Sequence, residues 1–557
     1  MDQKPNQGLD LEAIREKLRS GDGPVAWQSI EELAETPEFI EYLEREFPRQ
    51  AAPWFGGIDR REFLKLMGAS LALAGLAACR PQSIEKIVPY VRVPEDAPFY
   101  EEEHYATTLT LGGFGFGALA EAHNGRPTKV DGNPKHPSNR GTSNIWMGAT
   151  VLGLYDPDRS KNVVNLTRPS TWDEFNKVAH AELERQKSIK GAGIRILTET
   201  VTSPTLTTQV QDVLKAYPSA KWYSYEPANR DNMYEGAEMF FGMPAETLYS
   251  FDKADIILSL DCDFINSGPG HLRYAGDFAN KRRARQGKTD MNRLYVVESG
   301  ITVTGTMADH RLAVKAGDVF GIAQAIAAAM GVGGGAAANE HAEYVAAVAQ
   351  DLKSNSGRSI VVVGDHQPPE VHALAHAMNA ALGNVGKTVA YTEPIPASGA
   401  GGQAKAIATL TDELRAGTVD LLLIIGGNPA FTAPRDLGFS EALRKATFTV
   451  HLSLYQDETS SVSRWHLPMG HELETWGDAR AFDGTASITQ PLIEPLYDGK
   501  SAIEMMAGLF TKPADGYDLV RAYWQKRGMG EDFEKEWKRA LNSGVIPGTA
   551  APKITPA

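Results

Sequence analysis

The chain has 557 residues, of which 42% are hydrophobic and 23% are charged, a composition typical of a globular protein with about three or four domains at roughly 150 residues each. Its 56 lysine and arginine residues and 70 aspartate and glutamate residues give a formal net charge of -14, which argues against nucleic acid as a partner. The two cysteines, Cys79 and Cys262, exclude a disulfide framework and are too few for the four thiolates that an ordinary iron–sulfur cluster needs.

The N-terminal part of the chain predicts an extension followed by an export signal. Residues 1–58 are the extension, with acidic, helix-like patterns at 11–18 and 30–47. In residues 59–79, Arg60 and Arg61 precede an uncharged apolar run of 13 residues, Leu66–Ala78. This run is too short to cross a bilayer, which takes about 20 residues, and the layout is that of a twin-arginine signal. The alternative is a buried amphipathic helix that contains two arginines.

The apolar run ends at Leu76–Cys79, which matches a bacterial lipoprotein cleavage box. If Cys79 carries lipid, acyl chains would anchor the protein at the outer, periplasmic face of the cytoplasmic membrane. If it does not, Cys79 is a small buried residue. The extension is then either removed with the signal or kept with an uncleaved signal.

A proline-rich linker at 80–99 leads into a predicted small β domain at 100–160. Its strands are bounded by glycines, and Asn124 and Gly125 supply positive φ at one turn. The glycine cluster Gly112–Gly117 does not match a dinucleotide-binding fingerprint. The predicted strands are Thr107–Leu111, Leu119–His123 and Thr128–Val130.

From about residue 190, short continuous apolar runs alternate with helical, alanine-rich stretches. Strands that are buried on both faces, as in parallel sheets covered by helices, have this pattern. It predicts two α/β domains, at 161–335 and 336–500, with a flexible hinge at Gly331–Ala336 and a helical C-terminal segment at 501–557. The runs are Ile194–Leu197, Ile256–Leu260, Leu294–Val297, Ile360–Gly364, Leu421–Ile425 and Phe448–Leu454.

The most informative local motif is a strand at 421–425 that ends in Gly426, Gly427, Asn428 and Pro429. Two glycines at the carboxyl end of such a strand allow backbone amides to approach a ligand where open α/β sheets bind nucleotides. A tight turn without a ligand is the alternative.

A second candidate is the polar segment 465–478, which contains His471, Glu472, Gly477 and Asp478. Histidines and carboxylates can bind metal, but the spacing matches no metal motif. A hydrogen-bonded polar loop is the alternative.

Three further residues are candidates for metal or catalytic groups. His372 and His376 lie four apart and would share a helix face, but no third ligand is evident, so we predict surface histidines. Cys262 lies between Asp261 and Asp263 at a strand end. The flanking carboxylates should raise its pKa, which argues against a reactive thiolate. We predict neither a catalytic residue nor a metal ligand in this chain.

Several segments together resemble the Tat-variant-translocated molybdopterin oxidoreductases. The closest likeness is to the molybdopterin-like part of the B subunit of alternative complex III, a bacterial quinol-oxidising membrane complex. The likeness covers nearly the whole chain, and 426–429 and 466–478 also look like superfamily segments. The segments are Trp27–Leu33, Arg60–Ser70, Lys86–Val91, Gly125–Pro134 and Leu154–Arg159.

The resemblance implies an α/β body of the molybdopterin-oxidoreductase (dimethyl sulfoxide reductase) type with a small N-terminal β domain. Three departures from catalytic relatives are expected. The segment 107–132 contains no cysteine for a four-iron cluster, no convincing molybdenum ligand is found, and a C-terminal β-barrel lid is missing after the helical stretch Tyr517–Leu541. We therefore expect no cofactor in this chain.

By the same resemblance, iron–sulfur clusters and haems belong to partner subunits. The expected partners are a ferredoxin-like iron–sulfur chain, a polytopic quinol-binding membrane subunit and cytochrome c subunits, which would leave exposed apolar patches on this chain.

The sequence is compatible with three functions. The first is a non-catalytic, membrane-associated structural subunit of a periplasm-facing quinol:electron-acceptor oxidoreductase. The second is a catalytic subunit of polysulfide- or thiosulfate-reductase type, holding a bis-pterin cofactor through Gly426–Pro429, His471, Glu472, Gly477 and Asp478. The third is an exported binding protein for another small molecule.

Overall fold

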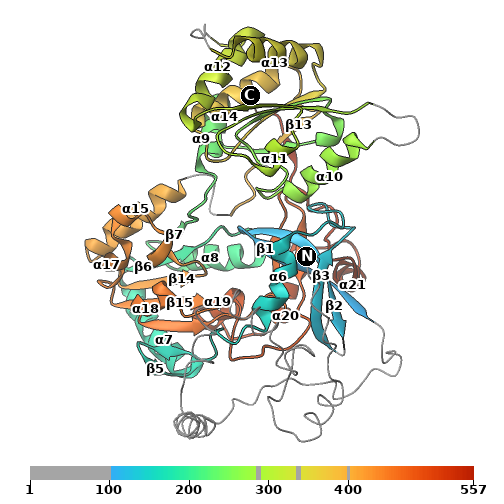
Figure 1. Cartoon of the computed structure of the whole chain (residues 1–557). Coiled ribbons are helices and arrows are strands. Elements are labelled where there is room, and N and C mark those ends of the chain that lie inside the picture. The colour runs from blue at the N-terminus through green and yellow to red at the C-terminus, as the bar shows by residue number, and fades with distance from the viewer. Residues whose placement is uncertain (1–101, 124, 284–289, 334–339, 398–401, 557) are drawn as a thin grey trace, which may run out of the picture. The chain divides into compact units, whose positions relative to one another are not determined.

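The computed structural model describes residues 102–556 except residue 124 and the segments 284–289, 334–339 and 398–401. These residues form a three-stranded meander, two mainly parallel sheets covered by helices, and two small antiparallel sheets (Figure 1). None of the helices in these ranges combines the length with the hydrophobicity that crossing a bilayer requires.

The meander contains β1 (Glu103–Leu111), β2 (Phe114–His123) and β3 (Arg126–Gly132), paired antiparallel in chain order. The strands that the sequence predicts here are confirmed. Gly125 has a φ of 75° at the second turn, a conformation that favours glycine. Helix α6 (Ile145–Leu154) packs its buried side chains against this sheet.

The larger α/β sheet has seven strands in the order β5-β4-β16-β15-β14-β6-β7. Counted along the chain, its parallel strands follow the order 2-1-3-4-5, so that the strand order reverses between β6 and β14. Every residue of β6, β14 and β15 is buried, which explains their continuous apolar runs. The strands are β4 (Val164–Asn165), β5 (Arg168–Pro169), β6 (Ile194–Thr198), β7 (Lys221–Ser224), β14 (Leu421–Ile425), β15 (Phe448–Ser453) and β16 (Trp465–Pro468).

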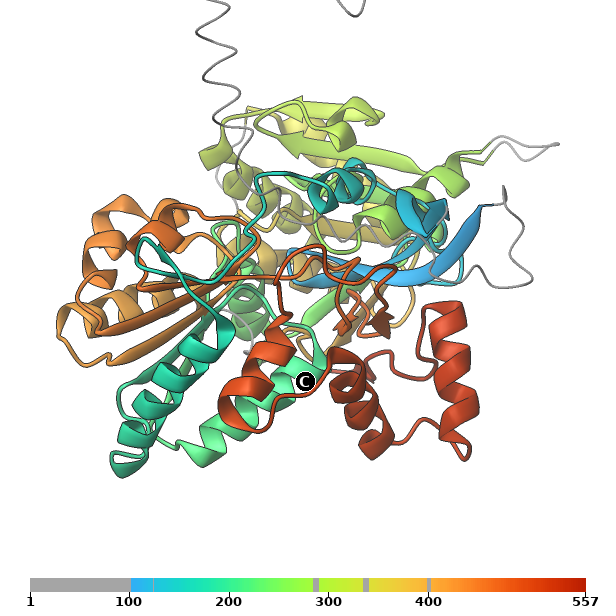
Figure 2. The same ribbon diagram turned by 90° about the horizontal axis from the view of Figure 1, so that it is seen from below.

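Helices cover both faces of the larger sheet. In Figure 2, α15 and α17 (orange) lie on one side, and α7 and α8 (blue-green and green) lie on the other. Side-chain caps define several helix starts; the Thr171 hydroxyl, for example, accepts a hydrogen bond from the Glu174 amide at the start of α7. The helices of this part are α7 (Trp172–Ser188), α8 (Pro204–Ala216), α15 (Gln403–Arg415), α16 (Pro429–Thr432), α17 (Phe439–Leu443) and α18 (Glu458–Val462), with the 3₁₀ turn η3 (Arg435–Leu437).

The second parallel sheet has four strands in the order β11-β10-β9-β12. Along the chain this order is 3-2-1-4, and the reversal falls between β9 and β12. Helices α12, α13 and α14 pack on one face, and α9, α10 and the small sheet β8-β13-β19 pack on the other. The elements are α9 (Asp231–Phe241), β8 (Glu246–Tyr249), η1 (Phe251–Lys253), β9 (Ile256–Leu260), α10 (His271–Arg282), β10 (Arg293–Glu298), α11 (Val303–Thr306), β11 (His310–Ala313), η2 (Ala316–Asp318), α12 (Val319–Met330), α13 (Ala342–Ser354), β12 (Ser359–Val363), α14 (Pro369–Ala381) and β13 (Val389–Thr392).

The two sheets are built from interleaved stretches of chain, which corrects the predicted division into 161–335 and 336–500. The larger sheet takes strands from 164–224 and again from 421–468, whereas the four-stranded sheet takes 256–363. Helices α12 and α13 lie on either side of residue 335 and cover the same sheet. Hydrophobic periodicity reports single strands and not their pairing, so it could not reveal this return of the chain.

The C-terminal part contains a hairpin of β17 (Gly477–Arg480) and β18 (Ala486–Thr489), followed by three helices. A capping box of Ser501 and Glu504 begins α19. The final strand β19 (Lys553–Ile554) pairs with β13, next to the four-stranded sheet. The helices are α19 (Ala502–Phe510), α20 (Gly516–Arg527) and α21 (Phe533–Ser543).

Candidate functional site

Open α/β sheets bind ligands beyond the carboxyl ends of their strands, at the point where the strand order reverses. The described residues contain two such points. One lies between β6 and β14, where the sequence predicts a ligand cradle at Gly426–Pro429. The other lies between β9 and β12.

At the first point, a carboxylate stands over the glycine turn. Gly426 and Gly427 have φ values of 70° and 63° directly after β14. A Cβ atom placed on Gly426 would lie 2.4 Å from Oε2 of Glu199, the residue that follows β6. In this structure the Glu199 carboxyl group therefore lies beside these glycines, where a phosphate group would bind.

The surroundings of Glu199 disfavour the ionised form of its carboxyl group. Its side chain is exposed to solvent, yet desolvation by the neighbouring protein, with the Glu226 carboxylate adding to the effect, raises its pKa to about 7. Asn428 also has its partners within the chain, because its Oδ1 accepts from the Thr459 hydroxyl at 2.8 Å and its Nδ2 donates to Glu458 at 2.6 Å. Pro429 begins the short helix α16.

The residues of the second predicted cluster also find their partners within the protein. His471 is buried, and its Nδ1 accepts the Leu473 amide at 3.1 Å. Burial lowers the pKa of His471 to about 4, so that its imidazole is neutral. The Glu472 carboxylate accepts the Thr110 amide at 2.9 Å.

Asp478 joins three separate segments of the chain. It accepts hydrogen bonds from the hydroxyls of Ser203 at 2.5 Å and Thr205 at 2.6 Å, and from Trp524 Nε1 at 3.0 Å. Gly477 is the first residue of β17. Asp478 thus fastens α8 and α20 to β17, while Glu472 connects the same loop to β1. None of the eight predicted cofactor residues lines the cavity described next.

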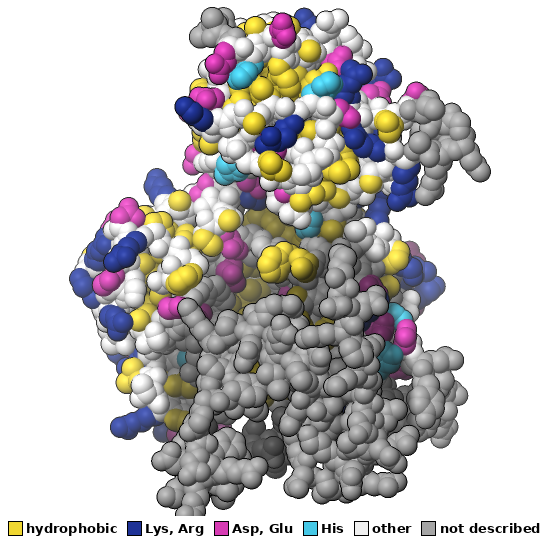
Figure 3. Space-filling model, viewed as in Figure 1, with side chains coloured by type: hydrophobic (Ala, Val, Ile, Leu, Met, Phe, Trp, Pro, Cys, Tyr) yellow, Lys and Arg dark blue, Asp and Glu magenta, His cyan; other side chains and the backbone are white. Residues whose placement is uncertain are grey.

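The second reversal point opens into a cavity of about 1110 Å³. Its floor is formed by the residues after β9, Asp261–Asp263, and by those after β12, Gly364–His366. The turn between β1 and β2 and the start of α6 also line it. In Figure 3, hydrophobic side chains lie around the hollow at the middle of the face that is turned toward the viewer.

The charged side chains of this cavity are mainly acidic. Glu246, Asp261, Asp263 and Asp365 line it together with Arg230. The Arg230 guanidinium is already shared, since it pairs with Glu246 at 2.9 Å and with Asp365 at 3.4 Å. Among the lining residues no second lysine or arginine balances the remaining carboxylates, so the cavity disfavours an anionic ligand.

Asp261 is held in an unusual conformation at the centre of the cavity floor. Its φ is 53°, a region that costs free energy for a residue with a side chain. Its carboxylate accepts from Gln367 Nε2 and His366 Nε2, each at 2.9 Å, and from the Ser299 amide at 3.2 Å. Desolvation raises the pKa of Asp261, but these hydrogen bonds outweigh it, so that its pKa is lowered and the carboxylate stays charged.

The prediction that His372 and His376 are surface residues is wrong. Both are buried, with 4% and 5% of their surface exposed, and both line the cavity from α14. Burial lowers their pKa values to about 4 and 3, and Nε2 of each lacks a hydrogen-bond partner within the described chain. Helix α14 packs tightly on α9, where a Cβ atom on Gly236 would meet His372 at 2.4 Å.

Cys262 lies in the same cavity. Desolvation, followed by the carboxylates of Asp365 and Asp263, raises the pKa of its thiol well above the ordinary value. A protonated thiol is a poor metal ligand and nucleophile, as expected from the aspartates beside it in sequence. The export-signal residues Arg60 and Arg61 and the lipidation candidate Cys79 lie outside the described residues.

Sequence reasoning missed this cavity because its polar residues follow strands that are distant in the chain. One signal for the cavity was available in the sequence: the polar residues Asp365 and His366 directly follow the predicted apolar run that forms β12. Only the pairing of β12 with β9 brings it beside Asp261.

Comparisons with known proteins identify relatives of this architecture, although no protein-family model matches the chain. The menaquinone reductase, molybdopterin-binding-like subunit of Nitratidesulfovibrio vulgaris is 22% identical in an alignment of 553 residues, which covers 86% of this chain and 76% of that protein. The resemblance to molybdopterin oxidoreductases is confirmed.

The solved structures include acetylene hydratase from Pelobacter acetylenicus, with a TM-score of 0.58, 13% identity, and coverage of 78% of this chain and 74% of that one. At this identity the match establishes the fold alone. The chain thus has a mixed α/β body that resembles that of a molybdopterin enzyme, as expected from the sequence.

Molybdopterin carries a phosphate group, so a site that binds it should offer positive charge or free backbone amides to that phosphate. At the first reversal point Glu199 stands in the glycine cradle, and at the second the cavity is lined by four carboxylates and one paired arginine. The residues at both points are poorly matched to such a group.

Proposed function

We propose that the chain is a non-catalytic structural subunit of a quinol:electron-acceptor oxidoreductase of the alternative complex III type. In this proposal it faces the periplasm at the cytoplasmic membrane and supports an iron–sulfur partner chain, while membrane and cytochrome c subunits complete the complex. The relative from N. vulgaris is itself named as a subunit of a menaquinone reductase. The observation that carries the proposal is the Glu199 carboxylate over Gly426.

The surface of α6 supports the role of a subunit that binds another chain. This helix has no charged residue and buries Met147, Val151 and Leu154. On its other side Ile145, Trp146 and Leu152 are 79%, 69% and 75% exposed. Apolar side chains clustered on one exposed helix face are typical of a protein–protein interface, and we assign this face to a partner subunit.

Elemental analysis of the purified protein tests the non-catalytic role. We expect less than about 0.1 equivalent of molybdenum or tungsten in protein isolated from its native membrane, because neither strand-order reversal offers a free cation for a phosphate. Near-stoichiometric molybdenum or tungsten would overturn the proposal. Mass spectrometry of the native N-terminus would establish whether Cys79 carries lipid and whether residues 1–58 are kept.

A second candidate function, a catalytic molybdopterin subunit of polysulfide- or thiosulfate-reductase type, is favoured by one observation. The cavity of about 1110 Å³ lies at a strand-order reversal, where this architecture binds large ligands. The same elemental analysis distinguishes the two, because only the catalytic subunit must retain a metal.

A further inference from the structure

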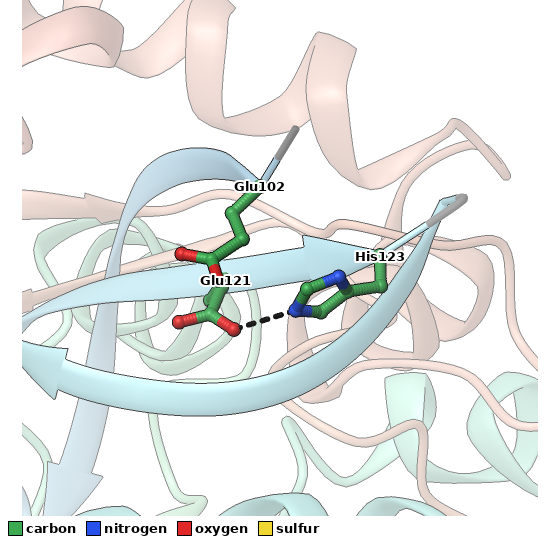
Figure 4. A group of neighbouring side chains, drawn as sticks. All are labelled: Glu102, Glu121 and His123. Atoms are coloured by element: carbon green, nitrogen blue, oxygen red, sulfur yellow. Dashed lines mark hydrogen bonds and ion pairs between the residues drawn. The ribbon is translucent and has the colours of Figure 1, made fainter. Parts of the chain in front are cut away.

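A group of metal-ligating side chains lies on the meander, away from both strand-order reversals. Figure 4 shows Glu102, Glu121 and His123 pointing toward one another, from the residue just before β1 and from the end of β2. Their ligand atoms all lie within 4.8 Å of one another. Two atoms bound to one tetrahedral zinc ion at about 2.0–2.2 Å lie about 3.3–3.6 Å apart, so side-chain rotations would bring the three into a coordination sphere.

The strand register places a second histidine beside this group. His104 on β1 stands directly opposite Glu121 on β2, and Glu103 stands opposite Ala122. Alternate residues of a strand share a face, so Glu102 and His104 lie on the same side of the sheet as Glu121 and His123. The His104 Nε2 atom is 3.9 Å from Glu121 Oε2, and His123 Nε2 is 2.7 Å from Glu121 Oε1.

The exposure of these groups leaves room for an ion. The side chains of His104 and His123 are 43% and 44% exposed, whereas Glu121 is 12% exposed and lies between them. The nearby Lys129 ammonium is held by Asp131 at 2.7 Å.

We propose that Glu102, His104, Glu121 and His123 form a binding site for a divalent transition-metal ion such as Zn²⁺. Two imidazole nitrogens and two carboxylate oxygens suit zinc and nickel, while magnesium and calcium prefer oxygen ligands alone. The ion would tie the first residues of β1 to the end of β2, at the point where residues 1–101 join the described body.

Calorimetric titration of ZnCl₂ into untagged, chelator-treated full-length protein tests this site. We expect one saturable site per chain. His104→Ala and His123→Ala should each weaken zinc binding by at least about tenfold, because even indirect partners of a metal ligand cost about 10–100-fold when mutated. Glu121→Gln should weaken it comparably. His180→Ala, an exposed histidine on α7, is the matched control and should bind zinc like the wild type.

Two results would overturn the proposal: no saturable binding of zinc to the wild type, or His104→Ala and His123→Ala variants that bind as tightly as it does. Melting curves recorded with chelator verify that the variants fold. X-ray absorption at the zinc edge of the wild-type protein provides a test that needs no variant, since this site requires two imidazole nitrogens and further oxygen ligands. A zinc spectrum without imidazole would contradict it.

Discussion

The backbone oxygen of Asp261 lies 2.1 Å from the point where a Cβ atom on Gly364 would stand. These residues follow the neighbouring parallel strands β9 and β12, so the ends of the two strands approach as closely as a glycine allows. Asp261 has a left-handed conformation, and its carboxylate accepts three hydrogen bonds. The cavity floor is therefore closely packed at Gly364.

Gly364→Ala should destabilise the protein by about 1–3 kcal/mol, the usual cost of forcing extra atoms into a packed region. The added methyl group must push the Asp261 backbone away, because a main-chain oxygen cannot rotate aside. A lower thermal midpoint would verify this. Gly321→Ala is the control, because Gly321 lies in α12 with no atom near its added Cβ; this substitution should be neutral or slightly stabilising. Equal midpoints for both variants would contradict the prediction.

Glu199→Gln should change how stability depends on pH. The folded protein raises the pKa of Glu199 from 4.5 to about 7, so the unfolded chain releases this proton at a lower pH than the folded one. The stability associated with the protonated form is present below pH 4.5 and is lost as the pH rises through about 7. Because glutamine cannot ionise, the variant should melt at a higher temperature than the wild type at pH 8 and at a similar temperature at pH 4.5. A difference that stays constant between these pH values would exclude the shifted pKa.

The sequence predicts single elements of this protein better than their arrangement. The continuous apolar runs at 421–425 and 448–454 identify buried strands, because a strand covered on both faces can tolerate few polar residues. The return of the chain from the four-stranded sheet to the larger one leaves no local signal, and the domain boundary at 335 fails for that reason.

The candidate sites show the same limit. The glycines after β14 are visible in the sequence, but Glu199 comes from a strand more than 200 residues earlier and reaches them only through the pairing of β6 with β14. His372 and His376 do share a helix face as their spacing predicts. The alanine-rich sequence around them gives little contrast between faces, and the tight packing of α14 on α9 decides that this face is inside.

Glu474→Gln should destabilise the protein strongly, because Glu474 forms a buried ion pair with Arg159. The atoms Arg159 Nη2 and Glu474 Oε2 are 2.6 Å apart, and the two side chains are 2% and 1% exposed. Breaking one partner of such a pair leaves a buried charge uncompensated, at a cost of about 3–5 kcal/mol. Chemical denaturation should detect this loss. The exposed pair Lys187–Glu184 is the control: Glu184→Gln should change stability by less than about 1 kcal/mol.

Trp146→Glu should separate this chain from its partner subunit while leaving its own fold intact. The indole is 69% exposed on the apolar face of α6, so a carboxylate there remains solvated in the free chain but is desolvated, without a partner, in an apolar interface. Exposed tryptophans are frequent hot spots, and the loss of one costs about 2 kcal/mol or more of binding free energy. Purification of the complex from native membranes should therefore yield less partner with Trp146→Glu than with wild type at an equal thermal midpoint of the isolated chain. Phe431→Glu tests an apolar side chain of matched exposure, 71%, on another helix, α16, and should leave the complex unchanged. Equal recovery of the partner with both variants would remove the α6 face from the interface.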